Sequence, residues 1–563
     1  MATDQTADPI ALADAFLSQG DVASAWTWAR RAIALDPHEP AAHNVFGIIA
    51  DSVFDLESAV AAFGRALVPD PYNAFVFGNI AGALGRAGVV EAAVRISRRA
   101  IALSPGDAPT YNAQANALKG AGYISESFAA YRRSIAIRSD SGLHSNLLFA
   151  LSYDDTLTSA QLFAEYRRWE RLHARPHYPA ALVHSSHADP DRPIVVGYLS
   201  QDFRDHPLGR ILVALFENHD PSAVTVNGYA SISRADETTE RCRQRSSAWH
   251  VVTGLSDDAA AARIRQDGVD ILVVVGAHTA HNRLLVAAQR PAPIIMSLDD
   301  VSTSGMEAVD YWITDPVIHP PGGTEATERF TEALLRLPCF FLQPPYESVP
   351  PPVEPPVVRS GQVTFGSFSN PAKLTPTTIA AWSAAMHAVP GSRLALKYMN
   401  WYGDTAVQAR VAAMFQRHGI GLDRIVFAVG EHGRDEQLAL WNNIDVALDP
   451  YPFGGWTSTF EAMWMGVPVI TLVGERFAGR TGLSILECLG LRELAAYRPE
   501  DFGGIAAALT SDLPRLTALR RDLRERLRVS PLCDGRTQAG YFEAAYRDVW
   551  RRWCAAQAAR GAR

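Results

Sequence analysis

The first quarter of the chain repeats a pattern of apolar, small and proline positions with a period of 34 residues. The clearest columns are apolar (Ile33, Leu67, Ile101, Ile135), small (Ala13, Gly47, Ala81, Ala115) and proline (Pro37, Pro71, Pro105). A unit of this length holds two antiparallel helices and a turn, because small residues let helices pack closely and a proline ends the second helix. The pattern therefore predicts a stack of helical hairpins, an α-solenoid, over residues 1–150.

These hairpins resemble tetratricopeptide repeats over roughly residues 6–150. Solenoids of that kind bind extended peptides or partner proteins on their concave face. We therefore expect a protein or peptide partner along the groove of the repeats. A solenoid that serves only structure or dimerisation is the alternative.

From residue 193 the pattern changes to short, apolar, β-branched runs that alternate with helical stretches. The runs expected to be strands are 194–199, 224–229, 269–275, 293–296 and 311–314 in a first series, and 363–368, 393–398, 424–429, 444–448 and 467–472 in a second. This alternation predicts two doubly wound parallel sheets, so the expected fold class is an α-solenoid followed by two αβ lobes. Ligands of such folds bind beyond the carboxyl ends of the strands and in the cleft between lobes.

A proline-rich segment separates the two series of strands. Seven prolines lie between Pro344 and Pro356, a density that excludes helix and central strand. The expected domains are an α-solenoid (1–150), a helical connector (151–190), an N-terminal αβ lobe (191–343), a linker (344–358) and a C-terminal αβ lobe with closing helices (359–563). The two lobes are thus expected to be joined by an extended hinge.

Composition narrows the class of protein. Of the 563 residues 48% are hydrophobic, which excludes global disorder. Acidic residues outnumber basic ones by 60 to 52, and the net charge of −8 disfavours a dedicated nucleic-acid binder. The five cysteines form no CxxC pair, and the sequence shows neither a signal-peptide pattern nor an apolar run of 18 residues. We expect a soluble, cytoplasmic protein with no membrane and no nucleic-acid partner.

Two loops that follow expected strands hold a histidine and a lysine suited to chemistry. His206 lies after the run 194–199, where an imidazole can act as a base or donate a hydrogen bond. A histidine that only caps a backbone carbonyl fits equally well. Lys373 precedes a helix start at Thr375-Pro376, where an ammonium group is favourable if an anion lies between it and the helix N-terminus. A solvated surface lysine is the alternative there.

A third loop, residues 449–461, passes from a strand through a Pro/Gly-rich turn into a helix start rich in hydroxyls. Free backbone N–H groups and the hydroxyls of Thr457 and Ser458 suit phosphate oxygens. Glu461 has two interpretations, a capping box with Ser458 or a carboxylate that accepts hydrogen bonds from ribose hydroxyls. The Asp-x-Asp at 189–191 precedes a strand and suits a turn. No metal or other cofactor is therefore expected, and the lysine and helix N-termini would stabilise a departing diphosphate.

Repeats followed by two αβ lobes with these three loops resemble the O-linked N-acetylglucosamine (O-GlcNAc) transferases, in the arrangement with few repeats of a bacterial homologue. The stretches that carry the resemblance are VGYLSQDFRDHP, RPAPI followed by TSG, FSNPAKLTP and DPYPFGGWTSTFEAMWMGVPVITL. The resemblance covers about residues 6–550. It implies a GT-B-type fold and an inverting transfer of N-acetylglucosamine (GlcNAc) from UDP-GlcNAc to serine or threonine hydroxyls of proteins. It also implies UDP-GlcNAc and a protein or peptide acceptor as partners.

The resemblance implies roles for individual residues as well. His206 matches the active-site histidine, proposed as a base or as a group that positions the acceptor, and Lys373 matches the lysine at the UDP diphosphate. The other implied substrate contacts are Asn370 near the nucleotide, Thr457 and Ser458 at the phosphates, Glu461 at the ribose, Arg434 and Gln437 near the uracil and ribose, Trp456 where animal members have a histidine, and His278 in the donor pocket.

The chain departs from the family pattern after RPAPI. Where the family continues with a glycine–proline turn, this chain has Asp299-Asp300, close to a site meant for a dianionic donor. Gln437 stands where a histidine is usual. These departures leave two alternatives open: a UDP-binding repeat scaffold whose transferase domain is non-reactive, and a transferase that uses another UDP-sugar or another acceptor.

Overall fold

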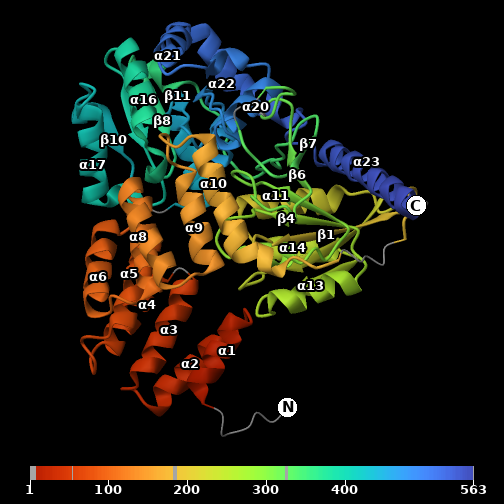
Figure 1. The fold of residues 1–563 in the computed structure, drawn as a ribbon. Coiled ribbons are helices and arrows are strands. Elements are labelled where there is room, and N and C mark those ends of the chain that lie inside the picture. The colour runs from red at the N-terminus through yellow and green to blue at the C-terminus, as the bar shows by residue number, and fades with distance from the viewer. Residues whose placement is uncertain (1–7, 54, 182–186, 324–327, 431, 562–563) are drawn as a thin grey trace.

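A helical arc and two sheets with flanking helices form the molecule in the computed structural model, which describes residues 8–53, 55–181, 187–323, 328–430 and 432–561 (Figure 1). The arc comes first in the chain and the two sheets follow it. The fold class expected from the sequence is confirmed. Within the described ranges no helix is long and apolar enough to cross a membrane.

The arc consists of paired antiparallel helices. Their bounds are α1 Pro9–Ser18, α2 Val22–Leu35, α3 Pro40–Ser52, α4 Leu56–Ala66, α5 Ala74–Arg86, α6 Val90–Leu103, α7 Ala108–Gly120, α8 Ile124–Ile137 and α9 Ser141–Leu151. Carboxylate caps begin several of them, as where Asp21 accepts a hydrogen bond from the Ser24 amide at 3.0 Å. A Cβ on Gly47 of α3 would lie 2.5 Å from the Phe63 ring of α4. Close helix packing therefore explains the column of small residues.

Helices also form the connector to the first sheet. Helix α10 (Ser159–Trp169) begins with a capping box between Thr158 and Gln161 and continues into the turns Glu170–Ala174 and Arg175–His177. The Trp169 ring is buried and lies 4.7 Å from the ring of His278 in the first lobe. The connector is thus packed onto the loops of the first sheet.

The first lobe holds a seven-stranded parallel sheet in the order β3-β2-β1-β4-β5-β6-β7. The strands are β1 Ile194–Ser200, β2 Val224–Ala230, β3 Ala248–Val251, β4 Ile271–Val275, β5 Ile294–Leu298, β6 Tyr311–Thr314 and β7 Ala333–Arg336, and the helices are α11 Pro207–Asn218, α12 Glu237–Gln244, α13 Asp257–Gln266 and α14 Leu284–Ala288. All five expected strands are present. The sequence pattern does not predict β3 and β7, because these short, part-exposed edge strands lack the apolar runs of buried strands.

The second lobe holds a six-stranded sheet in the order β10-β9-β8-β11-β12-β13. The strands are β8 Thr364–Ser367, β9 Arg393–Leu396, β10 Ile425–Phe427, β11 Val446–Leu448, β12 Val469–Leu472 and β13 Ala495–Ala496, and the helices are α16 Pro376–Ala388, α17 Thr405–Gln416, α18 Arg434–Ala439, α19 Thr457–Trp464, α20 Thr481–Cys488 and α21 Asp501–Ser511. The central strands β8 and β11 are parallel neighbours. The loops that follow them, which carry Lys373 and residues 449–456, therefore meet at one edge of the sheet.

The proline-rich segment and the last helices tie the lobes together. Residues 344–355 contain no helix or strand, and α15 (Pro356–Ser360) follows them. Helix α22 (Leu513–Arg528) packs on α19 and α21, whereas α23 (Gly535–Gly561) packs on α11 and β1. The hydroxyl of Tyr546 in α23 lies 2.9 Å from that of Tyr198 in β1. The final helix therefore belongs with the first lobe, although the sequence analysis assigned all closing helices to the second.

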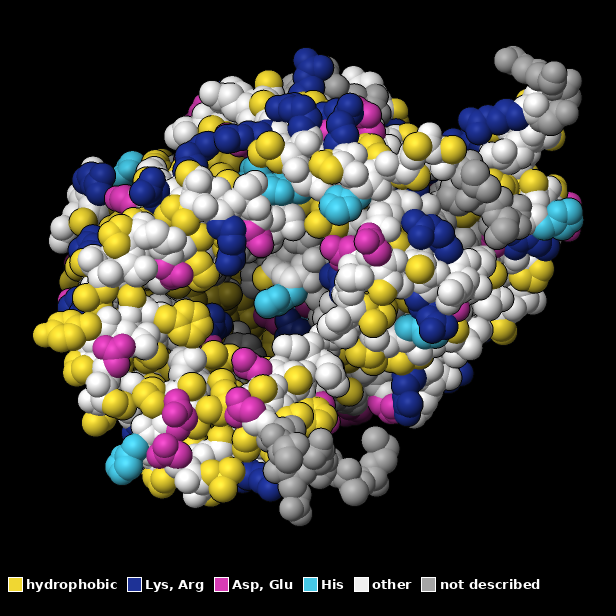
Figure 2. Space-filling model, turned by 60° about the horizontal axis from the view of Figure 1, so that its bottom comes forward, with side chains coloured by type: hydrophobic (Ala, Val, Ile, Leu, Met, Phe, Trp, Pro, Cys, Tyr) yellow, Lys and Arg dark blue, Asp and Glu magenta, His cyan; other side chains and the backbone are white. Residues whose placement is uncertain are grey.

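The solenoid contacts both lobes. Gly88 and Gly120 face the ring of Trp401 in the second lobe so closely that a Cβ on either would overlap it. Toward the first lobe, the Ser145 hydroxyl lies 3.1 Å from Nδ1 of His278. A deep hollow lies between the rims of the molecule on the face shown in Figure 2. The contacts with both lobes hold the repeats in a fixed position relative to the two sheets.

Candidate active site

His206 stands at the end of the loop after β1, where it is the N-cap residue of α11. Its Nδ1 accepts a long hydrogen bond from the Leu208 amide at 3.3 Å and lies 3.4 Å from Oδ1 of Asp202. Burial lowers the pKa of His206, and the Asp202 carboxylate opposes that shift only in part. The imidazole is therefore neutral at pH 7 and, with 34% of its side chain exposed, is able to accept a proton.

The same loop and helix contact the second lobe. Asp205 accepts a hydrogen bond from Arg434 at the start of α18, and the Arg210 guanidinium of α11 lies 5.6 Å from the centre of the Tyr346 ring. Tyr346 in turn donates a hydrogen bond to Oε1 of Glu461 in α19 at 3.1 Å. These contacts place the β1 loop and the first turns of α18 and α19 on opposite sides of the boundary between the lobes.

Lys373 ends a short 3-10 turn, η4 (Pro371–Lys373), after β8. Its Nζ donates a hydrogen bond to the Gly454 carbonyl at 2.6 Å and lies 4.2 Å from the centre of the Phe453 ring. Burial lowers the pKa of Lys373 to about 8, and the Asp449 carboxylate opposes this only in part. The nearby carboxylate therefore does not fully compensate the ammonium group, and a bound anion would stabilise its charged form.

Asp449, the first residue after β11, holds the third loop in place through hydrogen bonds. Its two carboxylate oxygens accept hydrogen bonds from the Gly455 amide at 2.7 Å and from the hydroxyls of Thr459 and Thr471 at 2.9 Å and 2.8 Å. Burial raises the pKa of Asp449, and these hydrogen bonds oppose the shift. Asp449 was not among the site residues expected from the sequence. Its position directly after β11 and ahead of a Pro/Gly-rich turn was the signal for it.

Trp456, Thr457 and Ser458 form the beginning of α19. Trp456 is the N-cap residue at φ +47°, and no side chain caps the helix. The Ser458 hydroxyl turns back to donate to the Gly455 carbonyl at 3.1 Å. The capping box between Ser458 and Glu461 is absent, so that interpretation of Glu461 is wrong. An uncapped helix N-terminus next to a part-buried ammonium is the arrangement expected of an anion site.

Three further residues named from the sequence lie around these two loops. Burial raises the pKa of Glu461, and the hydrogen bond from Tyr346 opposes the shift. Asn370 caps the η4 turn through its side-chain oxygen. Gln437 lies half-buried in α18, the helix that begins at Arg434. Glu461 shares its helix with Thr457 and Ser458. Nine of the ten site residues expected from the sequence thus lie on loops or in short helices where the two lobes meet.

His278 is the tenth, and its surroundings differ. It is 1% exposed, its Nδ1 lies 3.1 Å from the Ser145 hydroxyl and its Nε2 lies 2.9 Å from the Ser304 carbonyl. The rings of Tyr166 and Trp169 contact it edge-on. Both ring nitrogens are thus engaged by the protein. His278 packs the solenoid against the first lobe, and its expected place in the donor pocket stays a prediction.

Asp299 and Asp300 are buried at the end of β5, with exposed fractions of 5% and 1%. Burial raises the pKa of Asp299 to about 7, and it raises that of Asp300 well above its ordinary value with help from the nearby Glu332 carboxylate. No hydrogen bond of normal geometry reaches either oxygen of Asp300 within the described residues. Asp299 is therefore about half protonated at pH 7, and Asp300 is protonated more readily than an ordinary carboxyl, which weakens the repulsion that two carboxylates would exert on an anionic donor.

Amide side chains on successive repeats form a feature that the sequence analysis missed. Asn79 donates a hydrogen bond to Asn44 at 2.9 Å, and Asn146 donates one to Asn112 at 3.1 Å. All four lie on the first helix of their repeat, and helices of this kind line the inner side of a solenoid. Their spacing of 33 to 35 residues was the available signal. Side-chain amides offer both donors and acceptors to a peptide backbone.

Two parallel αβ lobes that face each other, with a histidine on one and an anion site on the other, define the GT-B class of glycosyltransferase fold. Within the described ranges, no group of three or more His, Cys, Asp or Glu side chains is placed to hold a metal ion. The chain belongs to glycosyl transferase family 41, whose model matches residues 122–346 and 357–541. The resemblance to O-GlcNAc transferases is confirmed by this match.

Similar proteins support the same assignment. The chain is 34% identical to the probable UDP-N-acetylglucosamine–peptide N-acetylglucosaminyltransferase SPINDLY of Solanum lycopersicum. The aligned region of 415 residues covers 73% of this chain and 44% of that protein. It is 30% identical over 379 residues to the corresponding probable enzyme SEC of Arabidopsis thaliana, covering 64% and 38%. The fold is similar to that of a mutant Thermobaculum terrenum O-GlcNAc transferase, with a TM-score of 0.82, 30% identity, and coverage of 99% of this chain and 100% of that one. The chain spans less than half the length of these two plant relatives.

Proposed function

We propose that this protein is an inverting glycosyltransferase that moves GlcNAc from UDP-GlcNAc to a serine or threonine hydroxyl of a polypeptide, without a metal ion. The observation that carries the proposal is the part-buried Lys373 ammonium, held 2.6 Å from the Gly454 carbonyl beside the uncapped start of α19. The names of the plant relatives and of the Thermobaculum transferase support the same donor sugar, and those of the plant relatives support a peptide acceptor.

The diphosphate of the donor binds between Lys373 and the first turn of α19. The helix dipole and the lysine both present positive potential to this point, and charge-assisted hydrogen bonds are the strong ones. The hydroxyls of Thr457 and Ser458 and the backbone N–H groups of the same turn donate to the phosphate oxygens. Asp449 fixes this turn through its bond to the Gly455 amide, so it acts as a positioning residue.

The nucleoside end of the donor lies toward α18 and the linker. Glu461 accepts hydrogen bonds from the ribose hydroxyls, a role favoured by its position in the first two turns of α19 and by the loss of the capping interpretation. Asn370, Arg434 and Gln437 contact the ribose or the base. The Arg434–Asp205 pair joins the two lobes and brings the nucleoside end close to the loop that carries His206.

His206 acts as the general base. Its ring accepts the proton of the acceptor hydroxyl, and the Asp202 carboxylate, 3.4 Å from Nδ1, stabilises the imidazolium that forms. The acceptor oxygen forms a bond with the anomeric carbon on the face opposite the diphosphate, and the bond from that carbon to the diphosphate oxygen breaks. The electron pair leaves with UDP, whose developing charge is stabilised by Lys373 and the helix N-terminus.

The acceptor approaches from the solenoid. The repeats pack on both lobes, and the hydrogen-bonded asparagine pairs on α3, α5, α7 and α9 supply amides suited to an extended peptide backbone. Such positioning lowers the entropic cost of bringing the hydroxyl to the sugar.

The test is transfer of label from UDP-GlcNAc, labelled in the sugar, to a pool of serine- and threonine-containing peptides. Wild-type protein is expected to label peptides, and Lys373→Ala and His206→Ala to lose labelling. UDP binding without transfer to any peptide would support the scaffold alternative instead. Transfer from another UDP-sugar alone would overturn the choice of donor and leave the reaction class intact.

A further inference from the structure

Arginines recur with the period of the repeats on the second helix of each unit. Arg31, Arg65, Arg99 and Arg133 are each 34 residues apart, and all four are exposed. They lie on α2, α4, α6 and α8. Because equivalent positions of stacked repeats lie side by side, these four residues form one row along the solenoid, called here the arginine row.

No carboxylate of the described residues forms an ion pair with the arginine row. The ion pairs of the described solenoid use other arginines, such as Arg86 and Arg132. Asp36 and Asp70 are the carboxylates that follow Arg31 and Arg65 most closely in sequence, and each accepts a hydrogen bond from a backbone amide of its own turn. The row therefore presents unneutralised guanidinium groups to solvent.

Rings support three of the four arginines, Arg31 from Trp28 of its own helix at 5.0 Å and the other two from the first helix of the same repeat. The Arg99 guanidinium lies 4.6 Å from the centre of the Phe77 ring, and that of Arg133 lies 6.0 Å from the Tyr111 ring. Phe77 and Tyr111 are themselves 34 residues apart, and His43 takes the same position one repeat earlier. A guanidinium held over a ring loses less side-chain freedom when it forms a bidentate pair with a carboxylate.

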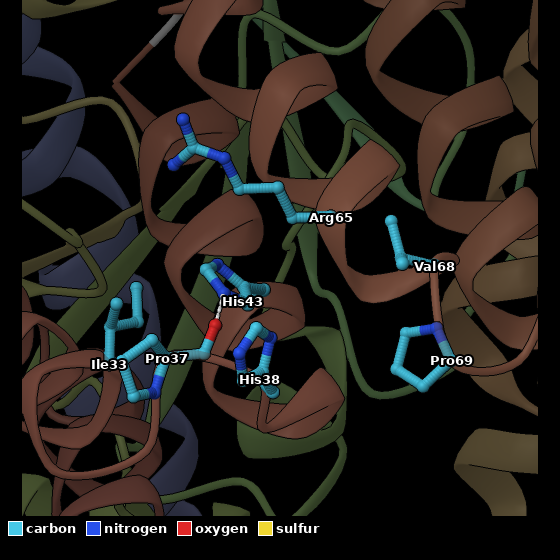
Figure 3. A pocket seen from close by; sticks show the side chains of 7 residues that line it. All are labelled: Ile33, Pro37, His38, His43, Arg65, Val68 and Pro69. Carbon is cyan, nitrogen blue, oxygen red and sulfur yellow. Dashed lines mark hydrogen bonds between the residues drawn. The ribbon is translucent and has the colours of Figure 1, made fainter.

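A pocket of about 680 Å³ opens beside this row between the first two repeats (Figure 3). Ile33, Pro37, Val68 and Pro69 give it apolar walls, and Arg65 reaches over it. Val68 is 75% exposed. Burial of this side chain against a partner would lower the free energy of the complex. The pocket therefore suits an apolar side chain whose neighbouring carboxylate would meet Arg65.

We propose that the arginine row and this pocket form a docking surface for an acidic, extended polypeptide segment with apolar side chains between its carboxylates. Guanidinium groups pair bidentately with carboxylates, and successive repeats offer successive pairs. A nucleic acid also carries negative charge, but it has no aliphatic side chain for the pocket, and the chain has a net charge of −8. The arginines of the row are on the second helices, whereas the asparagine pairs are on the first helices.

The test is fluorescence anisotropy of the full chain with a labelled peptide of repeated Glu-Leu-Asp-Gly units. A peptide of repeated Gln-Leu-Asn-Gly units and a single-stranded oligothymidine of equal length are compared with it. The acidic peptide is expected to bind, more weakly as salt rises, and the amide peptide to bind poorly. The variant Arg65→Gln/Arg99→Gln/Arg133→Gln is expected to weaken binding by about tenfold, the loss of three exposed pairs. Val68→Asp is expected to weaken it as well.

The matched control is Arg30→Gln/Arg95→Gln/Arg98→Gln, which removes the same charge from exposed arginines outside the row. It is expected to keep affinity within about twofold. UDP affinity serves as the check of folding in every variant and is independent of the docking surface. No binding of the acidic peptide, equal loss in both triple variants, or tighter binding of the oligonucleotide through the same arginines would each overturn the proposal.

Discussion

The Lys373 ammonium donates a hydrogen bond to the Gly454 carbonyl at 2.6 Å, and this contact joins the loop after β8 to the loop after β11. The two strands are parallel neighbours in the centre of the second sheet, so their loops meet at one edge. At the same edge α19 begins without a side-chain cap. The fold thus brings two sources of positive potential, a lysine and a helix N-terminus, to one point.

The affinity for UDP is expected to fall as pH rises through 8. Burial holds the pKa of Lys373 at about 8 in the free protein, so the group is charged below that pH and increasingly neutral above it. Only the charged form attracts the diphosphate, and affinity should fall by up to about tenfold per pH unit above the pKa. Titration of UDP across this range measures the effect. Lys373→Arg keeps its charge and is expected to give a flat profile; a flat profile for wild type would exclude the lysine as the titrating group.

Replacement of His206 is expected to affect turnover and spare nucleotide binding. His206→Ala should lower turnover by about 10²–10⁴-fold, the usual contribution of a general base, while the Kd of UDP stays within about twofold. Burial lowers the pKa of His206 below its ordinary value of 6.5, so wild-type kcat/KM should remain high below that pH. A loss of kcat/KM that already begins above pH 6.5 as the pH is lowered, or equal turnover of the variant and wild type, would argue against the base role.

Asp449 is expected to matter for stability as well as for binding. Asp449→Asn keeps the shape but replaces one acceptor oxygen by an NH₂ group. Either Thr471, or Gly455 and Thr459 together, then loses its acceptor. A buried donor left unpaired costs about 1–3 kcal/mol of the free energy of unfolding. Denaturant unfolding measures the loss, and UDP titration should show weaker binding because the start of α19 is less fixed. Unchanged stability and affinity would show that the loop does not depend on this carboxylate.

The contact between the solenoid and the second lobe is expected to be sensitive to a single methyl group. Gly120→Ala places a Cβ in the ring of Trp401, and overpacking of this kind costs about 1–3 kcal/mol. Thermal unfolding should show a lower Tm, and proteolysis should release the repeats more readily. Gly106→Ala is the control, because nothing lies within 4 Å of its Cβ position. Equal behaviour of the two variants would mean that the repeats are not held through Trp401.

Buried strands could be predicted from the sequence because apolar runs such as 271–275 are enclosed on both faces. The edge strands β3 and β7 escaped prediction, since their residues are part-exposed, and β13 has only two residues. The assignment of α23 to the second lobe was wrong because chain order does not reveal that Tyr546 meets Tyr198 across the molecule.

The candidate site could be predicted to the extent that parallel strands place their loops at one edge. Contacts between segments far apart in the chain could not be predicted. Tyr346 of the linker donates a hydrogen bond to Glu461, and the Ser145 hydroxyl of the solenoid forms a hydrogen bond with His278. The arginine row is visible as a 34-residue period in the sequence, but the rings beneath Arg99 and Arg133 come from other helices. Pairing of that kind depends on how the helices stack.

The most direct test of the diphosphate site is calorimetric titration of the full chain with UDP and UDP-GlcNAc in the absence of divalent metal, with Lys373→Ala alongside. We expect wild type to bind both nucleotides and the variant to bind about 10- to 100-fold more weakly, the loss of charge-assisted hydrogen bonds to the diphosphate. Equal affinity of the two proteins, or no binding by wild type, would contradict the site built from Lys373 and the start of α19.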